Sequence, residues 1–100
     1  MSPVRLEVHP QAIVEACAAR RWYAQRSVAA ANQFVAELDH AVVQITSAPQ
    51  QWPSYLHGTR VYRLRRFPYL AVYRELPGSV QVVAVAHGRR KPGYWRRRLP

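Results

Sequence analysis

The feature that most constrains this chain is an apolar run that stops abruptly at a cluster of charge near the C-terminus. Val80 to Ala86 reads VQVVAVA and is typical of a β-strand, because β-branched residues dominate it. His87 to Trp95 follows at once and reads HGRRKPGYW, which combines cations with aromatic rings. A chain of 100 residues buries only a modest core. So much charge at one strand end therefore indicates a surface that meets a negatively charged partner.

The overall charge supports the same interpretation. The chain carries 15 basic and 5 acidic residues, a formal net charge of +10 at pH 7. Fourteen of the basic residues are arginine, whose guanidinium matches phosphate or carboxylate in a bidentate fashion. Arg60 to Pro100 holds eleven of the basic residues and a single acidic one, Glu75. This distribution favours nucleic acid or an acidic protein as the partner.

Cysteine and hydrophobic patterning limit the remaining classes. A single cysteine, Cys17, excludes a disulfide within the chain and a thiol-based metal site, and it is expected to be an inert core residue. The N-terminus lacks the apolar run of a signal peptide, and no stretch approaches the ~18 apolar residues of a membrane span. The sequence therefore predicts a cytoplasmic protein without a membrane segment, a metal or a cofactor.

Hydrophobic periodicity, together with residues that typically begin or end helices, predicts one strand and two helices in the first half of the chain. Residues 4–8 alternate as a half-buried strand does, and Pro10 suits the first position of a helix that continues to Gln25. Ser27 is a good N-cap for a second helix, which Pro49 ends. Apolar residues at helical spacing mark the packing face of each helix. They are Ile13, Ala16, Cys17, Trp22, Tyr23 and Ala24 in the first helix and Ala31, Phe34, Leu38, Ala41, Val42 and Ile45 in the second.

Three strands follow a loop over residues 50–59. Residues 60–65 alternate, residues 69–76 resume the alternation, and Pro77-Gly78 predicts a tight turn with positive φ at the glycine. The predicted order is β-α-α-β-β-β in the α+β class, with a helical hairpin packed on a mainly antiparallel sheet. We expect a single domain over residues 1–100, with a basic tail from about residue 88.

An arginine is expected on the sheet face that the helices leave open. Alternation places Arg63 or Arg74 there beside tyrosines, an arrangement that could bind phosphate and stack bases. The alternative is an ordinary solvated face.

The segment after the last strand offers further candidates. His87 has the titration range of a general acid or base, or else makes a hydrogen bond that holds the tail. Tyr94 and Trp95 could stack bases, or tuck the tail onto the core. Gly88 is expected to turn the chain with positive φ, and the three arginines of residues 96–98 are expected to be mobile.

Three segments resemble one known family. The motif H-G-R-R-x-P-x-Y-W at residues 87–95 resembles the C-terminal signature of ParE toxins in the RelE/ParE superfamily. R-R-F-P-Y-L-A-V-Y-R at residues 65–74 is similar to the central strand pair of that family, and A-x-x-F-x-x-x-L at residues 31–38 to its second helix. The resemblance covers essentially the whole chain and implies the same RelE/ParE-like fold.

The resemblance implies the toxin of a bacterial type II toxin–antitoxin module, held in a hetero-oligomer by an acidic segment of its cognate antitoxin. ParE-like members poison DNA gyrase, whereas RelE-like members cut messenger RNA on the ribosome, so the shared fold leaves the target open. We expect gyrase inhibition, without an enzymatic activity of the toxin itself. The alternatives are a ribosome-dependent mRNA endonuclease and a degenerate protein that only binds its antitoxin.

Each interpretation has its own expected residues. Contacts with the target are expected at Arg89, Arg90, Lys91, Tyr94 and Trp95, and contacts with the antitoxin at Arg60, Arg63, Arg74, Phe34 and Leu38. An endonuclease would instead use His87, Arg90, Tyr94, Arg63 and Arg74 as acid, base and cationic groups. If the tail is the effector, removal of residues 93–100 should abolish toxicity and leave the sheet folded, because no strand residue is lost.

Overall fold

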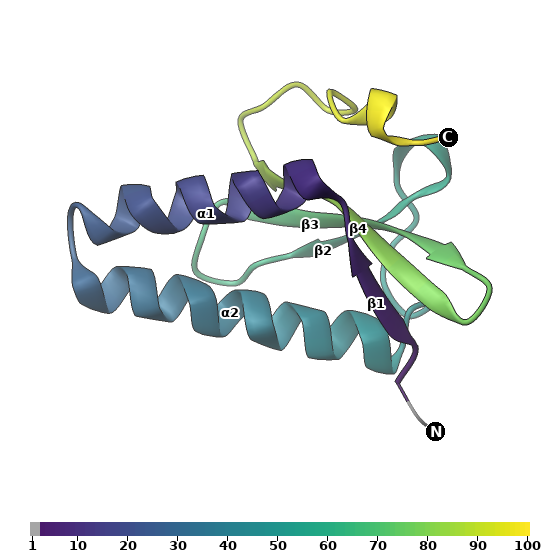
Figure 1. Cartoon of the computed structure of the whole chain (residues 1–100), viewed down its shortest axis with the longest axis horizontal. Coiled ribbons are helices and arrows are strands. Elements are labelled where there is room, and N and C mark those ends of the chain that lie inside the picture. The colour runs from purple at the N-terminus through teal and green to yellow at the C-terminus, as the bar shows by residue number, and fades with distance from the viewer. Residues whose placement is uncertain (1–2) are drawn as a thin grey trace.

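The computed structural model describes residues 3–100 and shows two helices on a four-stranded sheet (Figure 1). The predicted order β-α-α-β-β-β and the α+β class are confirmed. The elements are β1 (Arg5–Val8), α1 (Pro10–Ala24), α2 (Val28–Ser47), β2 (Arg60–Arg63), β3 (Tyr69–Leu76) and β4 (Ser79–His87), with short 3₁₀ turns η1 (Leu56–Gly58) and η2 (Arg96–Arg98). In this part of the chain, no helix is long and apolar enough to cross a membrane.

The sheet has the strand order β1-β4-β3-β2. β2, β3 and β4 form an antiparallel meander, and β1 joins β4 in parallel at the opposite edge. The turn between β3 and β4 contains Gly78 at φ 72°, as predicted. The helical hairpin carries the chain from β1 to the far edge of the sheet, where β2 begins (Figure 1).

The second helix forms as its sequence predicts. Ser27 caps it by accepting a hydrogen bond from the Ala30 backbone N–H at 3.1 Å. Its predicted apolar face is buried or half-buried throughout, and Phe34 and Ile45 have no exposed surface. Phe34 meets Tyr23, Phe67 and Tyr69 at ring-centroid distances of 5.3–5.4 Å, so aromatic packing ties this helix to α1 and to β3.

The packing face of α1 differs from the predicted one. Ala12 and Ala19 are buried, whereas Ile13 is 51% exposed and Cys17 is exposed. Small side chains let α1 approach β4 closely, and the larger apolar residues turn outward. The expectation that Cys17 lies in the core is therefore wrong.

A bulge in β4 explains why its apolar run does not alternate. Val72 pairs with Ala84 and Tyr73 with Val82, so Val83 has no opposite residue in β3. Residues before the bulge and after it consequently reverse which face they occupy. Val82 and Val85 pack under the helices, while Val83 and Ala84 pack on the other face of the sheet.

The C-terminal arm, residues 88–100, covers the sheet face that the helices leave free. Trp95 is 1% exposed and packs there on Val61, Val72, Val83, Ala84 and Ala86. Arg63 and Arg74 lie on this face, since Arg63 pairs with Leu70 and Arg74 borders Leu99 of the arm. The expected neighbours are wrong, because Tyr62 and Tyr73 pack under the helices and the arm supplies a second apolar layer here.

Two local predictions for the arm are also wrong. Positive φ occurs at Gly93 (83°) and is absent at Gly88. At Gly88 a Cβ would instead lie 3.4 Å from the Pro68 carbonyl oxygen, which accepts the Gly88 N–H at 2.7 Å. Of the three arginines expected to be mobile, Arg98 is held in place, because its side chain is 15% exposed and ion-paired with Glu15, whereas Arg96 and Arg97 are exposed.

Candidate functional site

The arm is attached to the body of the protein by two anchors, of which the first is apolar. Trp95 occupies the core cluster on the sheet face away from the helices, which we call the second core cluster. The centroids of the Tyr55 and His57 rings lie 6.1 and 5.9 Å from that of the Trp95 ring. Its burial fixes the middle of the arm on the sheet. Trp95 therefore offers no surface to a partner in this conformation, which corrects the expectation of a direct target contact.

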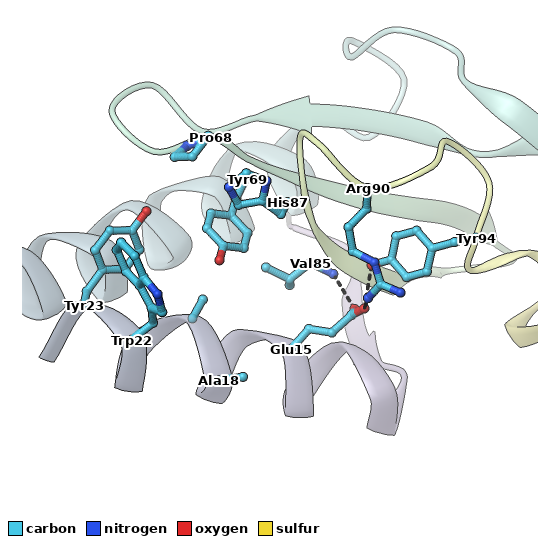
Figure 2. Close-up of a pocket in the computed structure, with 11 residues that line it drawn as sticks. Glu15, Ala18, Trp22, Tyr23, Pro68, Tyr69, Val85, His87, Arg90 and Tyr94 are labelled. Atoms are coloured by element: carbon cyan, nitrogen blue, oxygen red, sulfur yellow. Dashed lines mark hydrogen bonds and ion pairs between the residues drawn. The ribbon is translucent and has the colours of Figure 1, made fainter. Parts of the chain in front are cut away.

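The second anchor is the carboxylate of Glu15, which projects from α1 toward the end of β4 (Figure 2). One oxygen accepts the Val85 backbone N–H at 3.1 Å and the Arg98 Nη1–H at 2.8 Å. The other accepts the Arg98 Nη2–H at 3.0 Å and the Tyr94 hydroxyl. Arg98 thus binds the carboxylate in a bidentate fashion, the strongest geometry for such a pair.

The short first strand leaves backbone groups of β4 for this site to bind. β1 ends at Val8, opposite Val82 of β4. Beyond Val82, no strand among the described residues pairs with the edge of β4 that β1 covers before it. Two edge groups there are satisfied by side chains, since Glu15 accepts the Val85 N–H and Arg98 donates to the Val83 carbonyl at 3.1 Å. The ion pair therefore replaces a missing strand at this edge.

Protonation states follow from these contacts. Burial alone would raise the pKa of Glu15, but hydrogen bonds from Arg98, Tyr94 and the Val85 N–H outweigh burial and lower it. Burial and the hydrogen bond to Glu15 raise the pKa of Tyr94 far above that of a free phenol. At neutral pH Glu15 is therefore charged, and Tyr94 is a neutral donor that cannot act as a base.

A groove of about 470 Å³ opens beside this anchor, and we call it the Glu15 groove. At its rim the Arg90 guanidinium stacks 3.7 Å from the centre of the Tyr94 ring and lies 3.7 Å from Glu15. The Arg90 side chain remains 55% exposed. The groove is lined by Glu15, Ala18, Ala19, Trp22, Tyr23, Pro68, Tyr69, Val85, His87, Arg90 and Tyr94 (Figure 2).

His87 lies in the same groove but holds the chain in place. Its Nδ1 accepts the Arg89 backbone N–H at 3.0 Å, and its ring meets Tyr69 edge-on at 5.1 Å between centroids. These contacts order the turn that leads from β4 into the arm. The geometry agrees with the alternative in which His87 holds the tail by a hydrogen bond.

The five residues expected of an endonuclease are divided among three grooves. His87, Arg90 and Tyr94 line the Glu15 groove, and Arg63 lines a separate groove with His40 and Trp52 beside β2. Arg74 lies in a third groove with Arg96 and donates to Gln81 at 2.7 Å. Among residues 3–100, no three His, Cys, Asp or Glu side chains come together as metal ligands would.

The residues expected to contact an antitoxin differ in how exposed they are. Phe34 is 0% exposed, so the expectation of a direct contact there is wrong for this conformation. Leu38 is half-buried and Arg63 is exposed. Arg60 is partly engaged, because it pairs with Glu75 at 3.0 Å and donates to the Trp52 carbonyl at 2.7 Å.

Sequence reasoning missed Glu15, the central residue of the site. A signal was present, because position 15 falls on the stripe that runs from Ala12 to Ala19 along the packing face of α1. A carboxylate on such a stripe must find donors inside the protein. In a chain with fourteen arginines, one of them was the natural partner.

Comparison with known proteins agrees with this architecture. The family model for the ParE toxin of the type II toxin–antitoxin system parDE matches residues 6–92. The chain belongs to the ParE toxin family. A solved structure described as the chromosomal ParDE TA system from P. aeruginosa has a similar fold, with a TM-score of 0.62 at 19% sequence identity. The match covers 84% of this chain and 95% of that one. No protein with a curated description matches significantly.

Proposed function

We propose that this ParE family member inhibits DNA gyrase through its C-terminal arm and is neutralised by a cognate antitoxin. Family membership makes it a toxin component of a type II module. The choice of gyrase rests chiefly on one observation, the division of the candidate catalytic residues among three grooves.

RNA cleavage needs an acid, a base and cationic groups that converge on one phosphate. In this protein the Tyr94 hydroxyl donates to Glu15, and the raised pKa of Tyr94 keeps it protonated. Arg63 and Arg74 lie in other grooves than His87. This arrangement favours a toxin that acts by binding.

The arm has the properties of a docking element. Arg89, Lys91, Arg96 and Arg97 are exposed on it, while Trp95 and Arg98 hold it to the body. A cationic segment held in one conformation loses little entropy on binding an acidic target. Gyrase bound to DNA offers such a target.

The antitoxin is proposed to cover the outer side of α1 and the Glu15 groove. Ile13, Val14 and Trp22 are 49–55% exposed on this helix, next to the mainly apolar lining of the groove. An acidic segment with apolar side chains would match both this surface and the exposed cations nearby. We expect the toxin–antitoxin hetero-oligomer to bury more than about 1,000 Å².

A supercoiling assay with purified gyrase tests the proposal. The double substitution Arg96→Ser/Arg97→Ser should raise the half-inhibitory concentration by about tenfold or more, because it removes two exposed charges of the arm. Arg20→Ser/Arg21→Ser removes the same charge from exposed positions of α1 and serves as the matched control. Equal potency of the two variants would contradict a role for the arm.

A mixing experiment tests neutralisation. The protein encoded beside this chain should bind it and restore supercoiling when added in equimolar amount. Failure of a folded neighbouring protein to bind would contradict the proposed partner.

A further inference from the structure

The Glu15 anchor holds the residues on either side of Trp95, through Tyr94 and Arg98, whereas the Trp95 anchor holds the middle of the arm. Trp95 is held by packing of its ring against apolar side chains of the sheet. Glu15 meets Arg98 through two N–H···O bonds at 2.8 and 3.0 Å, which set both the distance and the plane of the guanidinium. Side-chain exposures of 13% and 15% keep this pair away from solvent.

The exposed charges of the arm lie directly beside the fixed residue. Arg96 and Arg97 share the η2 turn with Arg98, and both are exposed. The turn is closed by hydrogen bonds from the Arg98 N–H to the Trp95 carbonyl and from the Leu99 N–H to the Arg96 carbonyl. Holding the Arg98 side chain therefore also fixes the backbone turn from which Arg96 and Arg97 project.

The same carboxylate orients Arg90 at the start of the arm. Tyr94, Arg98 and the Val85 N–H already occupy both carboxylate oxygens, so Arg90 approaches Glu15 no closer than 3.7 Å. Glu15 holds the Tyr94 ring by accepting a hydrogen bond from the Tyr94 hydroxyl, and the exposed Arg90 guanidinium stacks on this ring at 3.7 Å (Figure 2).

We propose that Glu15 is a positioning residue for the C-terminal arm, which sets Arg90 at one end and the turn carrying Arg96 and Arg97 at the other for contact with the target. The inference rests on the proposed function of the arm. Without Glu15 the arm keeps its cations and its Trp95 anchor. Its ends must then be ordered on binding, which lowers affinity but leaves saturating inhibition intact.

The test compares Glu15→Gln with Glu37→Gln. Glu37 also accepts backbone N–H groups, those of Arg65 and Arg66, but it holds the turn between β2 and β3. Glu15→Gln should raise the half-inhibitory concentration for gyrase by about tenfold or more without lowering maximal inhibition. Amide hydrogen exchange of residues 96–99 should accelerate, because the η2 turn loses the contact that holds it to α1. Glu37→Gln should leave potency and this exchange unchanged.

A folded Glu15→Gln protein with wild-type potency and wild-type exchange would overturn the proposal. If that variant does not fold, Arg98→Gln removes the contact from the arm and leaves the Val85 N–H bonded to Glu15. It must show the same loss of potency, and unchanged potency would again overturn the proposal. If the wild-type protein does not inhibit gyrase, the proposed function fails. In that case, unchanged exchange in the arm of either folded variant would still overturn the positioning role.

Discussion

Replacement of Trp95 by alanine should reveal how firmly the arm is docked. Trp95 is the largest fully buried side chain and is 1% exposed. Its removal leaves a cavity against Val61, Val72 and Val83, which the rigid sheet cannot fill. Trp→Ala changes in cores cost about 3–5 kcal/mol of unfolding free energy. For a domain of this size, that equals a fall in Tm of roughly 15–25 °C.

Trp22→Ala is the matched control, because it removes the same side chain from α1. Trp22 is 49% exposed, and its contacts are an edge-on approach to Tyr23 and a stack with Arg26. We expect a loss of about 1 kcal/mol at this position. Thermal and urea unfolding of both variants, followed by circular dichroism, measures the difference. Equal Tm values for Trp95→Ala and Trp22→Ala would refute the docked arm.

The same packing changes how a truncation should be interpreted. Removal of residues 93–100 deletes no strand residue, but it uncovers the second core cluster and takes Arg98 and Tyr94 from Glu15. The expectation that such a protein keeps a folded sheet is therefore replaced by an expected loss of stability. Charge substitutions in the arm are the better test of its function.

Three further outcomes follow from the geometry. The folded-state pKa of Glu15 is lowered from its ordinary value of 4.5. The stability that Glu15 contributes is therefore present above pH 4.5 and is lost as the pH falls through the folded-state pKa. Acid unfolding should accordingly be steeper for wild type than for Glu15→Gln. Gly93→Ala should cost about 1–2 kcal/mol, because φ is 83° there, and more than Gly88→Ala, whose φ is not positive; urea titration compares the two. Ser27→Ala should cost about 1 kcal/mol in the same titration, through loss of the cap on α2.

Local signals predicted the elements well. Ser27, Pro49 and the Pro77-Gly78 turn each act through neighbouring backbone, so their effect is visible in the sequence. The stripe on α2 is broad enough to identify its buried face. The resemblance of the tail motif led to the family that the match over residues 6–92 shows.

The errors concern contacts between distant segments. Which side of α1 faces β4 depends on how closely the helix approaches, and alanines at 12 and 19 permit an approach that Ile13 would prevent. The arm covers the open face because Trp95 finds a cluster built from three strands. Glu15 and Arg98 stand 83 positions apart, and no local pattern pairs them. The candidate site was therefore predicted as a set of arm residues without the carboxylate that holds them.

The most direct test of the central claim uses one purified preparation in two reactions. Gyrase, relaxed plasmid and ATP form the first, and translating ribosomes with a defined message form the second. We predict inhibition of supercoiling or trapped gyrase-cleaved DNA in the first reaction and an intact message in the second. The account would be contradicted if gyrase were unaffected while the message was cut, and if His87→Ala lowered the rate of cutting by about 10²-fold or more.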